Sequence, residues 1–388
     1  PTALGFPLDG ERPGPSADAT MAGLMVLASL GAPPERFIAL GDWGGAALGG
    51  YEKKTAYKVA HAMDTSTLAN PVAFVVNTGD NFYFCGLKNA SDPQVAADFE
   101  EPYGPVKGLD VPWYSTLGNH EYGWNVAAQI ELTARSKRWV LPARYYSKRL
   151  ALGGGAAHVS LLFLDTSPCV SQYRAPDPSK WDPCSTEYPS CGPIDDTAEC
   201  RFHENILTQD CDAQFDWFAA SLAAVPADDW LVVVGHHPLD EVNVRDFASL
   251  LQVHGFHLYL NGHVHALNQY TLDGKGLYIT SGAGAMLKTK DQESDSVRAK
   301  IAGLSFTSLS PHLPFSATAG RLPSSALSSA PAESAVHHTY ETVWSQKIAG
   351  FTTHQFSPDY LTLTNEFVSF EGEIIRTVAV RKDGGVSA

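Results

Sequence analysis

HLYLNGHVH, residues 257–265, joins an apolar run to an Asn-Gly corner and then to two histidines, His263 and His265. In an extended chain, residues i and i+2 point to the same side, so the sequence predicts two imidazoles presented in one direction. That arrangement suits a pair of metal ligands. The alternative is a solvated loop that is rich in histidine, and the rest of the chain decides between the two.

Four other apolar runs end in a glycine-containing corner of the same kind. They are RFIALGD (36–42), VAFVVNTGD (72–80), VPWYSTLGNH (111–120) and WLVVVGHHP (230–238). Each has the length of a strand and is apolar throughout, which is typical of strands buried on both faces. Stretches with helical character lie between the runs, at 51–64, 125–139 and 212–224. This alternation predicts a layered α/β fold.

The remaining segments predict the domain organisation. Residues 1–35, rich in Pro, Gly and small residues, are expected to be an N-terminal extension, and residues 36–388 a single domain. That domain would carry a Cys-rich insert at 168–211 and a Ser/Pro-rich loop at 290–340. The terminal stretch 351–381 has the pattern of antiparallel strands that close a sheet edge.

Charge and hydropathy argue against nucleic-acid binding and against a membrane span. The chain has 27 basic and 42 acidic residues, and its net charge of -15 repels a nucleic-acid backbone. The most apolar early stretch, MAGLMVLASL at 21–30, has roughly half the length needed to cross a bilayer. We therefore expect neither nucleic-acid binding nor a membrane span.

The cysteines indicate the compartment. Five of the six fall within residues 169–211, and Cys85 lies far upstream. The close CxxC pairs of a zinc site are absent, so disulfides are favoured over zinc, although the sequence leaves their pairing open. Disulfides favour an oxidising environment, either secreted or in an endomembrane, lysosome-like compartment. The glycosylation acceptor pattern Asn89-Ala90-Ser91 agrees with secretion.

Polar residues with metal-ligand chemistry follow each of the five runs. They are Asp42, Asp80, Tyr83, Asn119, His120, His236, His263 and His265. Any one of them would be an ordinary turn or a satisfied polar residue, but five strand ends together predict one site, because ligands gather at the carboxyl ends of strands. The donor types suit Fe(III), Fe(II), Zn(II) or Mn(II). Two adjacent cations need a bridging ligand, for which Asp80 is suited, with His263 and His265 taking one ion each.

The motifs also carry a resemblance to a known family. GDWG (41–44), GDNFY (79–83), GNHE (118–121), GHHP (235–238), GHVH (262–265) and SGAGA (281–285) resemble the blocks of the purple acid phosphatases. The likeness is to the small mammalian-type, tartrate-resistant kind within the calcineurin-like metallophosphoesterases, and it covers roughly 36–289 and 349–383. It implies a β-sandwich flanked by helices, in αββα layers.

The resemblance implies a ligand set and an activity. It assigns Asp42, Asp80, Tyr83 and His265 to a ferric ion, and Asp80, Asn119, His236 and His263 to a divalent iron, zinc or manganese ion. It implies a metal-dependent acid phosphatase that hydrolyses phosphate monoesters by attack of metal-bound hydroxide. The two carboxylates and an ionised Tyr83 would leave part of the charge of the two ions for a phosphate anion. His120 would orient the phosphate and help to protonate the leaving group, which fits an acidic optimum.

One segment departs from the family pattern. The small enzymes carry a further substrate-binding histidine after GH-x-P, together with an acidic neighbour, but DEVNVRDFASLLQV (240–253) contains no histidine. His237, beside a predicted ligand, is the candidate to replace it in catalysis. His254 and His257 are expected to be structural.

Two alternatives remain at the level of the sequence. A non-catalytic or weakly active scaffold could keep the fold and use the insertions at 168–211 and 290–340 to bind protein partners. A phosphodiesterase or nucleotidase of the same superfamily is the other alternative. Tyr83 disfavours the second, because a phenolate ligand marks the purple subgroup.

Overall fold

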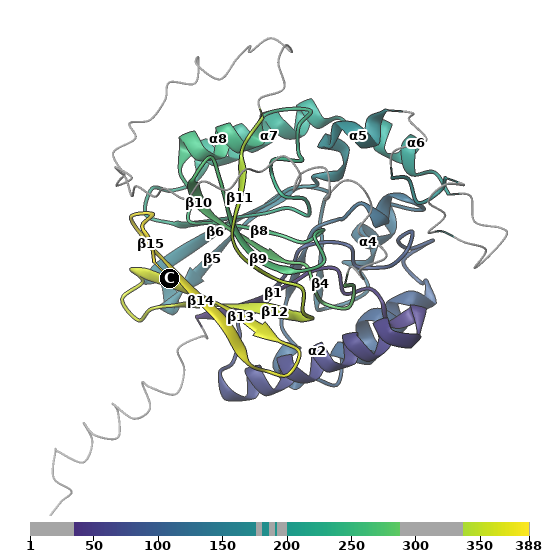
Figure 1. Ribbon diagram of the computed structural model, residues 1–388, viewed down its shortest axis with the longest axis horizontal. Helices are drawn as coiled ribbons and strands as arrows, with labels where there is room; N and C mark the ends of the chain where they lie inside the picture. Colours follow the sequence, from purple (N-terminus) through teal and green to yellow (C-terminus); the bar gives the residue numbers. More distant parts are fainter. Residues whose placement is uncertain (1–34, 176–180, 186–190, 192–199, 288–336, 388) are drawn as a thin grey trace, which may run out of the picture.

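Two mixed β-sheets pack face to face between layers of helices in the computed structural model (Figure 1). The structure describes residues 35–175, 181–185, 191, 200–287 and 337–387. This arrangement confirms the predicted layered α/β sandwich.

The first sheet has the strand order β15-β14-β13-β12-β1-β2-β3-β4. Its parallel half consists of β1 (Arg36–Leu40), β2 (Phe74–Asn77), β3 (Trp113–Ser115) and β4 (Trp139–Val140). Its antiparallel half consists of β12 (Gly350–Phe356), β13 (Thr362–Ser369), β14 (Ile374–Arg381) and β15 (Val386–Ser387). Three predicted runs and the predicted terminal strands are therefore confirmed.

The second sheet has the strand order β11-β9-β10-β8-β7-β6-β5. Its strands are β5 (Tyr146–Leu152), β6 (Ala157–Phe163), β7 (Trp230–Val234), β8 (Leu258–Asn261), β9 (Leu267–Leu272), β10 (Lys275–Ser281) and β11 (Tyr340–Gln346). The four strands β6, β7, β8 and β10 run parallel to their neighbours in that series. The other two predicted runs are β7 and β8.

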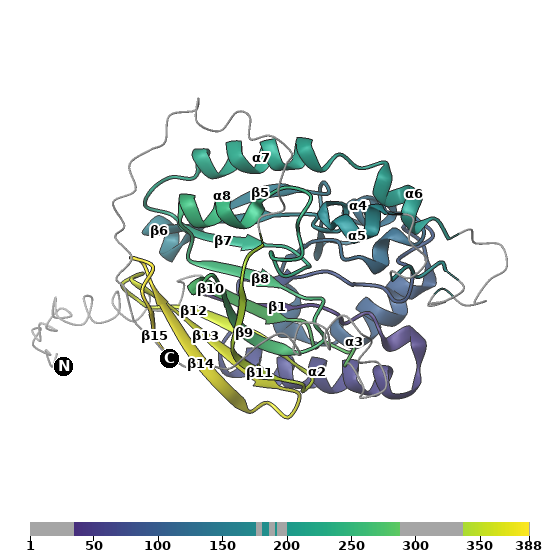
Figure 2. The ribbon, with the colours of Figure 1, turned by 45° about the horizontal axis from the view of Figure 1, so that its top comes forward.

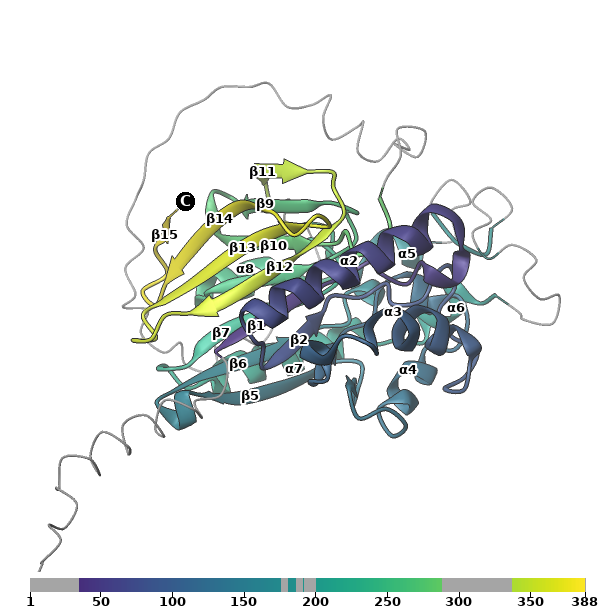
Figure 3. The same ribbon diagram turned by 90° about the horizontal axis from the view of Figure 1, so that it is seen from below.

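Helices cover both outer faces of the sandwich. In Figure 2, α7 (Cys211–Ala224) and α8 (Phe247–His254) lie on one side of the sheets and α2 (Gly50–Ala69) on the other. Figure 3 shows α2 crossing the first sheet. The shorter helices are α3 (Glu101–Tyr103), α4 (Ala127–Leu132), α5 (Ser171–Arg174) and α6 (Phe202–Leu207). Single turns of tighter or wider helix are η1 (Ala46–Leu48), η2 (Val95–Glu100), η3 (Lys107–Leu109), η4 (His120–Tyr122), η5 (Gly153–Gly155) and η6 (Ser167–Cys169).

The helix predicted at 125–139 is too long. The helix α4 ends at Leu132, and β4 begins at Trp139. The hydroxyl of Thr133 accepts a hydrogen bond of 2.9 Å from the backbone N–H of Leu141, which ties the end of the helix to the chain beyond β4. A side chain that bonds the backbone in this way competes with continued helix. The helix predicted at 212–224 is confirmed, and the one at 51–64 extends to Ala69.

Two apolar cores explain why the strands are apolar on both faces. The larger core lies between the sheets and under α2, and includes Phe37, Val75 and Met63, each 0% exposed. The smaller core lies between the second sheet and the helices α7 and α8, and includes Val233 and Phe218. Because each sheet is covered on both faces, alternation of polar and apolar residues is lost in the central strands.

Three disulfides confirm the prediction that the cysteines are paired with one another. They are Cys85–Cys191, Cys169–Cys211 and Cys184–Cys200, and they leave no free cysteine. Among the described residues, no helix has the length and apolarity to cross a membrane. Residues 1–34 and 288–336 lie outside the described residues, so the predicted extension, the Ser/Pro-rich loop and the single-domain boundary stay predictions.

Candidate metal centre

The carboxyl ends of strands from both sheets meet on one side of the sandwich. Asp42 follows β1, Asp80 follows β2 and Asn119 comes after β3 in the first sheet. His236 follows β7 and His263 follows β8 in the second. The Nδ1 atom of His236 lies 2.8 Å from the carbonyl oxygen of Thr78, which joins the two sets of strand ends directly.

One group of donors surrounds the phenol of Tyr83. The Oη atom of Tyr83 lies 3.1 Å from Oδ1 of Asp42 and 3.0 Å from Oδ2 of Asp80. It also lies 3.1 Å from Nε2 of His265, which is 3.2 Å from Oδ1 of Asp42. These four side chains thus form a compact set of oxygen and nitrogen donors.

A second group of donors surrounds the amide of Asn119. The Oδ1 atom of Asn119 lies 3.1 Å from Nε2 of His236 and 3.1 Å from Nδ1 of His263. The same Nε2 of His236 lies 3.2 Å from Oδ2 of Asp80. One oxygen of Asp80 therefore belongs to both groups.

The backbone at the two histidines differs from the expectation. The strand β8 ends at Asn261, and His263 and His265 lie in the following loop with φ of 69° and 52°. The prediction that they are extended is therefore wrong. The N–H of His263 donates to Oδ2 of Asp42 at 2.9 Å, so the loop curls around that carboxylate and is not extended.

Left-handed backbone recurs at the predicted carboxylate ligands. Asp42 has φ of 55° and Asp80 has φ of 51°. Non-glycine residues in this region cost free energy, and such residues cluster at functional sites. Two glycines allow the backbone to pass close to these carboxylates. A Cβ atom on Gly118 would lie 2.1 Å from Oδ1 of Asp80, and one on Gly262 would lie 2.5 Å from Oδ2 of Asp42.

The donor set fits two metal ions that share a ligand. Donors that bind one ion at about 2.0–2.2 Å lie roughly 3 Å from one another when the bond angles are near 90°. The separations within each group match that spacing. Asp42 and Asp80 are 0% and 1% exposed, and their side-chain partners are imidazoles and a phenol. Buried carboxylates need compensating positive charge, which bound cations would supply.

The electrostatics of the site also favour a cation. Burial, with Asp42 and Asp80 beside it, holds the pKa of the Tyr83 phenol well above its ordinary value. Burial alone would keep His236 neutral, but the neighbouring Asp80 outweighs it and raises the pKa of this imidazole to about 9. The carboxylates therefore draw positive charge to the site, and a phenolate at Tyr83 requires a cation next to it.

His120 and His237, the two predicted catalytic residues, lie in different surroundings. The side chain of His120 is 10% exposed, its Nε2 lies 3.9 Å from Oδ2 of Asp80, and its Nδ1 lies 2.5 Å from the carbonyl oxygen of Phe84. His237 is fully buried, with Nδ1 2.8 Å from the hydroxyl of Thr166 and Nε2 3.1 Å from that of Tyr173. Burial, with His263 and His236 nearby, holds the pKa of His237 well below its ordinary value.

Comparison with protein families and known proteins identifies the family of this chain. The family model described as calcineurin-like phosphoesterase matches residues 35–267. The chain belongs to this family. It is 32% identical over 266 residues to tartrate-resistant acid phosphatase type 5 of Mus musculus, covering 65% of this chain and 73% of that protein. It is 31% identical over 251 residues to purple acid phosphatase 7 of Arabidopsis thaliana, covering 64% of this chain and 70% of that protein.

Two solved structures share the fold of this chain at lower sequence identity. The anchor GAP50 in the inner membrane complex of Plasmodium aligns with a TM-score of 0.55 at 20% identity, covering 88% of this chain and 87% of that one. The purple acid phosphatase PPD1 of yellow lupin (Lupinus luteus) aligns with a TM-score of 0.51 at 14% identity, covering 90% of this chain and 54% of that one. Both likenesses bear on the fold alone.

Two acidic residues near the centre were missed as site residues. Glu121, buried in the GNHE motif, accepts hydrogen bonds from the backbone N–H groups of Asp80 at 3.1 Å and Asn81 at 2.8 Å, and so fixes the loop after β2. Glu241 places Oε2 3.4 Å from Nε2 of His263. The signal for Glu121 was its place in the motif, and for Glu241 its place just after GHHP.

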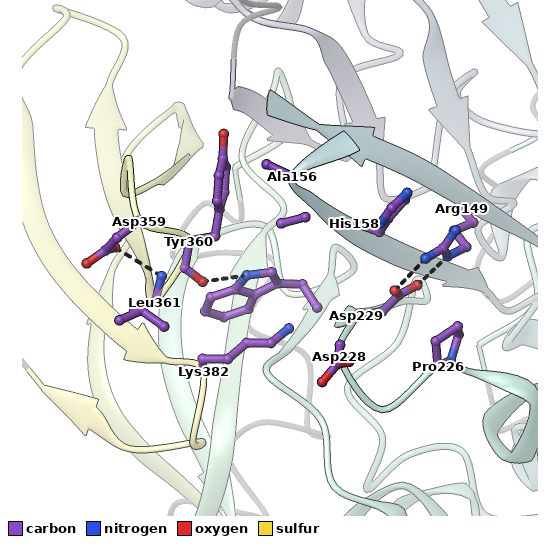
Figure 4. A pocket seen from close by; sticks show the side chains of 12 residues that line it. Arg149, Ala156, His158, Pro226, Asp228, Asp229, Asp359, Tyr360, Leu361 and Lys382 are labelled. Carbon is purple, nitrogen blue, oxygen red and sulfur yellow. Dashed lines mark hydrogen bonds and ion pairs between the residues drawn. The ribbon is translucent and has the colours of Figure 1, made fainter. Parts of the chain in front are cut away.

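A separate cleft lies at the opposite ends of the strands. It has a volume of about 410 Å³ and is lined by residues at the starts of β6 and β7 and by Lys382 after β14 (Figure 4). Arg149 is paired with Asp229 at 2.7 Å, and Lys382 lies over the ring of Trp230. None of the predicted ligands lines this cleft, so its chemistry is separate from that of the metal centre.

Proposed function

We propose that this protein is a dinuclear metal-dependent acid phosphatase that hydrolyses phosphate monoesters. The observation that carries the proposal is the pair of donor groups that share one oxygen of Asp80. Membership of the calcineurin-like phosphoesterase family and the similarity to acid phosphatases support it.

The residues divide between two ions. Asp42, Tyr83 and His265 would hold a ferric ion, and Asn119, His236 and His263 a divalent iron, zinc or manganese ion, with Asp80 shared. When bound, the pair would supply Lewis acidity toward the phosphate and an activated water molecule. Each group contains the oxygen and nitrogen donors that these ions prefer.

Hydrogen bonds outside the donor groups set the direction of the ligands. The carbonyl oxygen of Thr78 accepts from Nδ1 of His236, which leaves Nε2 of that ring to face the shared carboxylate. Glu121 holds the backbone that carries Asp80. Such outer contacts fix the tautomer and orientation of a ligand before the ion arrives.

His120 is the proposed catalytic residue next to the donor groups. Its Nδ1 contacts the carbonyl oxygen of Phe84, and its Nε2 faces the carboxylate of Asp80 at 3.9 Å. From there it would orient the phosphate and help to protonate the leaving group. A catalytic role for His237 stays a prediction, and its burial and two hydrogen bonds make direct proton donation to a substrate unfavourable.

Three disulfides support a compartment outside the cytosol. We propose a secreted or endomembrane, lysosome-like location. The glycosylation pattern begins at Asn89, which is exposed and is thus accessible to modification.

The substitution His120→Ala tests this assignment. We expect the variant to keep both metals, because the seven ligand positions are untouched, and to lose roughly 10²- to 10⁴-fold in kcat, as expected for a positioned acid or base. The measurement is release of phosphate from p-nitrophenyl phosphate together with metal content. The matched control is His254→Ala, an exposed histidine at the end of α8.

The same assay separates the alternatives. An unchanged rate in His120→Ala would remove this residue from the mechanism. Faster turnover of a phosphate diester than of a monoester would favour the phosphodiesterase. A wild-type protein that holds both metals and releases no phosphate would favour a scaffold.

A further inference from the structure

A tryptophan from the Cys-rich insert lies against the proposed catalytic histidine. The ring centroid of Trp181 is 4.9 Å from that of His120, with an angle of 61° between the planes. Trp181 is half-buried, so part of the residue remains open to solvent. The insert therefore contributes an aromatic side chain to the surroundings of the metal centre.

Packing and disulfides hold Trp181 in that place. Its ring packs against Phe202 at 5.3 Å and Tyr173 at 5.9 Å, at the edge of a small apolar cluster. Cys184, three residues further along, is bonded to Cys200. The disulfide Cys85–Cys191 joins the insert to the segment just after Tyr83. A side chain fixed in this way can present a constant surface to a ligand.

The exposure of the ligands shows from which side a substrate reaches the centre. Asp42 and His236 are both 0% exposed, whereas the side chains of His263 and His265 are 22% and 15% exposed. A phosphate bound at the ions would therefore carry its organic group toward the exposed side. Glu241 lies next to His263, one of the two exposed ligands, and Trp181 lies next to His120.

We propose that Trp181 is a specificity-determining residue that packs against the organic group of the substrate and favours aryl phosphates. The proposal rests on the phosphatase function proposed above. A planar aromatic group stacks on an indole or meets its edge favourably, which a small alkyl group cannot do.

Binding of two inert phosphonates tests the proposal without requiring turnover. Phenylphosphonate and methylphosphonate are titrated calorimetrically into the metal-loaded protein. The substitution Trp181→Leu keeps apolar bulk but removes the ring, so we expect it to weaken phenylphosphonate about fivefold and leave methylphosphonate within about twofold. Trp181→Phe, which restores a ring, should retain most of the preference. The control is Trp217→Leu, a half-buried tryptophan on α7 that packs against Tyr145.

The outcomes separate this inference from the proposed function. If both phosphonates weaken equally in Trp181→Leu, or neither changes, Trp181 does not set specificity, whatever the activity. If Trp181→Phe loses the preference for phenylphosphonate over methylphosphonate as fully as Trp181→Leu, packing of an aromatic ring at position 181 against the ligand is also ruled out. A wild-type protein that binds neither phosphonate and releases no phosphate from p-nitrophenyl phosphate would overturn the proposed function itself.

Discussion

Tyr83 is the residue on which the proposal of an iron ion depends most. Its hydroxyl lies between the carboxylates of Asp42 and Asp80, and burial with these charges holds its pKa well above the ordinary value. A ferric ion would ionise it, and charge transfer from phenolate to Fe(III) would colour the protein. We therefore predict a pink to purple oxidised protein, and loss of most of the visible band in Tyr83→Phe.

The absorbance spectrum, normalised to iron content, measures this effect. Tyr57→Phe is the control, because Tyr57 is 39% exposed on α2. A visible band that survives Tyr83→Phe unchanged at equal iron content would show that Tyr83 is not an iron ligand.

Individual residues differ in how far the sequence could predict their place. Asp42 and Asp80 could be predicted to meet, because each follows an apolar strand with a glycine corner. The direction of His237 could not, because Thr166 and Tyr173 hold its ring from segments that are distant in sequence. The position of Trp181 depends on disulfides whose pairing the sequence left open.

At the scale of elements, Asp98 on η2 is a buried acid that connects two helical turns. Its Oδ1 accepts a hydrogen bond of 2.6 Å from the N–H of Ala47 in η1. Burial raises the pKa of Asp98 to about 7. The protonated Asp98 carboxyl contributes its full free energy to folding below the pKa that aspartate has in the unfolded chain, about 4. This contribution is lost as the pH rises through 7.

The substitution Asp98→Asn should remove this pH dependence. An amide oxygen can still accept from Ala47 but never ionises, so the variant should gain stability relative to wild type between pH 4 and pH 8, by on the order of 4 kcal/mol at most. Urea unfolding at several pH values measures the difference. The control is Asp110→Asn, at an exposed acid. If the free energies of unfolding of Asp98→Asn and wild type differ by the same amount at every pH in that range, the prediction is contradicted.

Element boundaries could be predicted where burial decides them and not where single hydrogen bonds do. The five apolar runs became strands because both faces of each sheet are covered. The helix α4 ends next to Thr133, whose hydroxyl accepts a bond from the N–H of Leu141, and the loop at His263 is held by its N–H bond to Asp42. Both bonds join parts of the chain that the hydrophobic pattern does not relate.

At the scale of the whole molecule, the fold brings two sheets together so that their strand ends supply one site. Each sheet contributes part of both donor groups, because Asp42 and Asp80 come from the first sheet and His265 and His236 follow strands of the second. The layered class could be predicted from the alternation of runs and helices. The Cys-rich insert is held by the three disulfides and reaches the same site.

Activity measured against the amount of bound metal is the decisive test of a dinuclear phosphatase. The protein, stripped of metal by a chelator, is reloaded with iron and a divalent ion in steps, and phosphate release from p-nitrophenyl phosphate is measured at each stoichiometry at acidic pH. We predict that activity rises with occupancy and levels off near two ions per chain, and that Asp80→Ala, which removes the shared ligand, binds less metal and stays inactive. Full activity without metal, or two tightly bound ions with no phosphate release from pH 4 to pH 8, would contradict a dinuclear phosphatase.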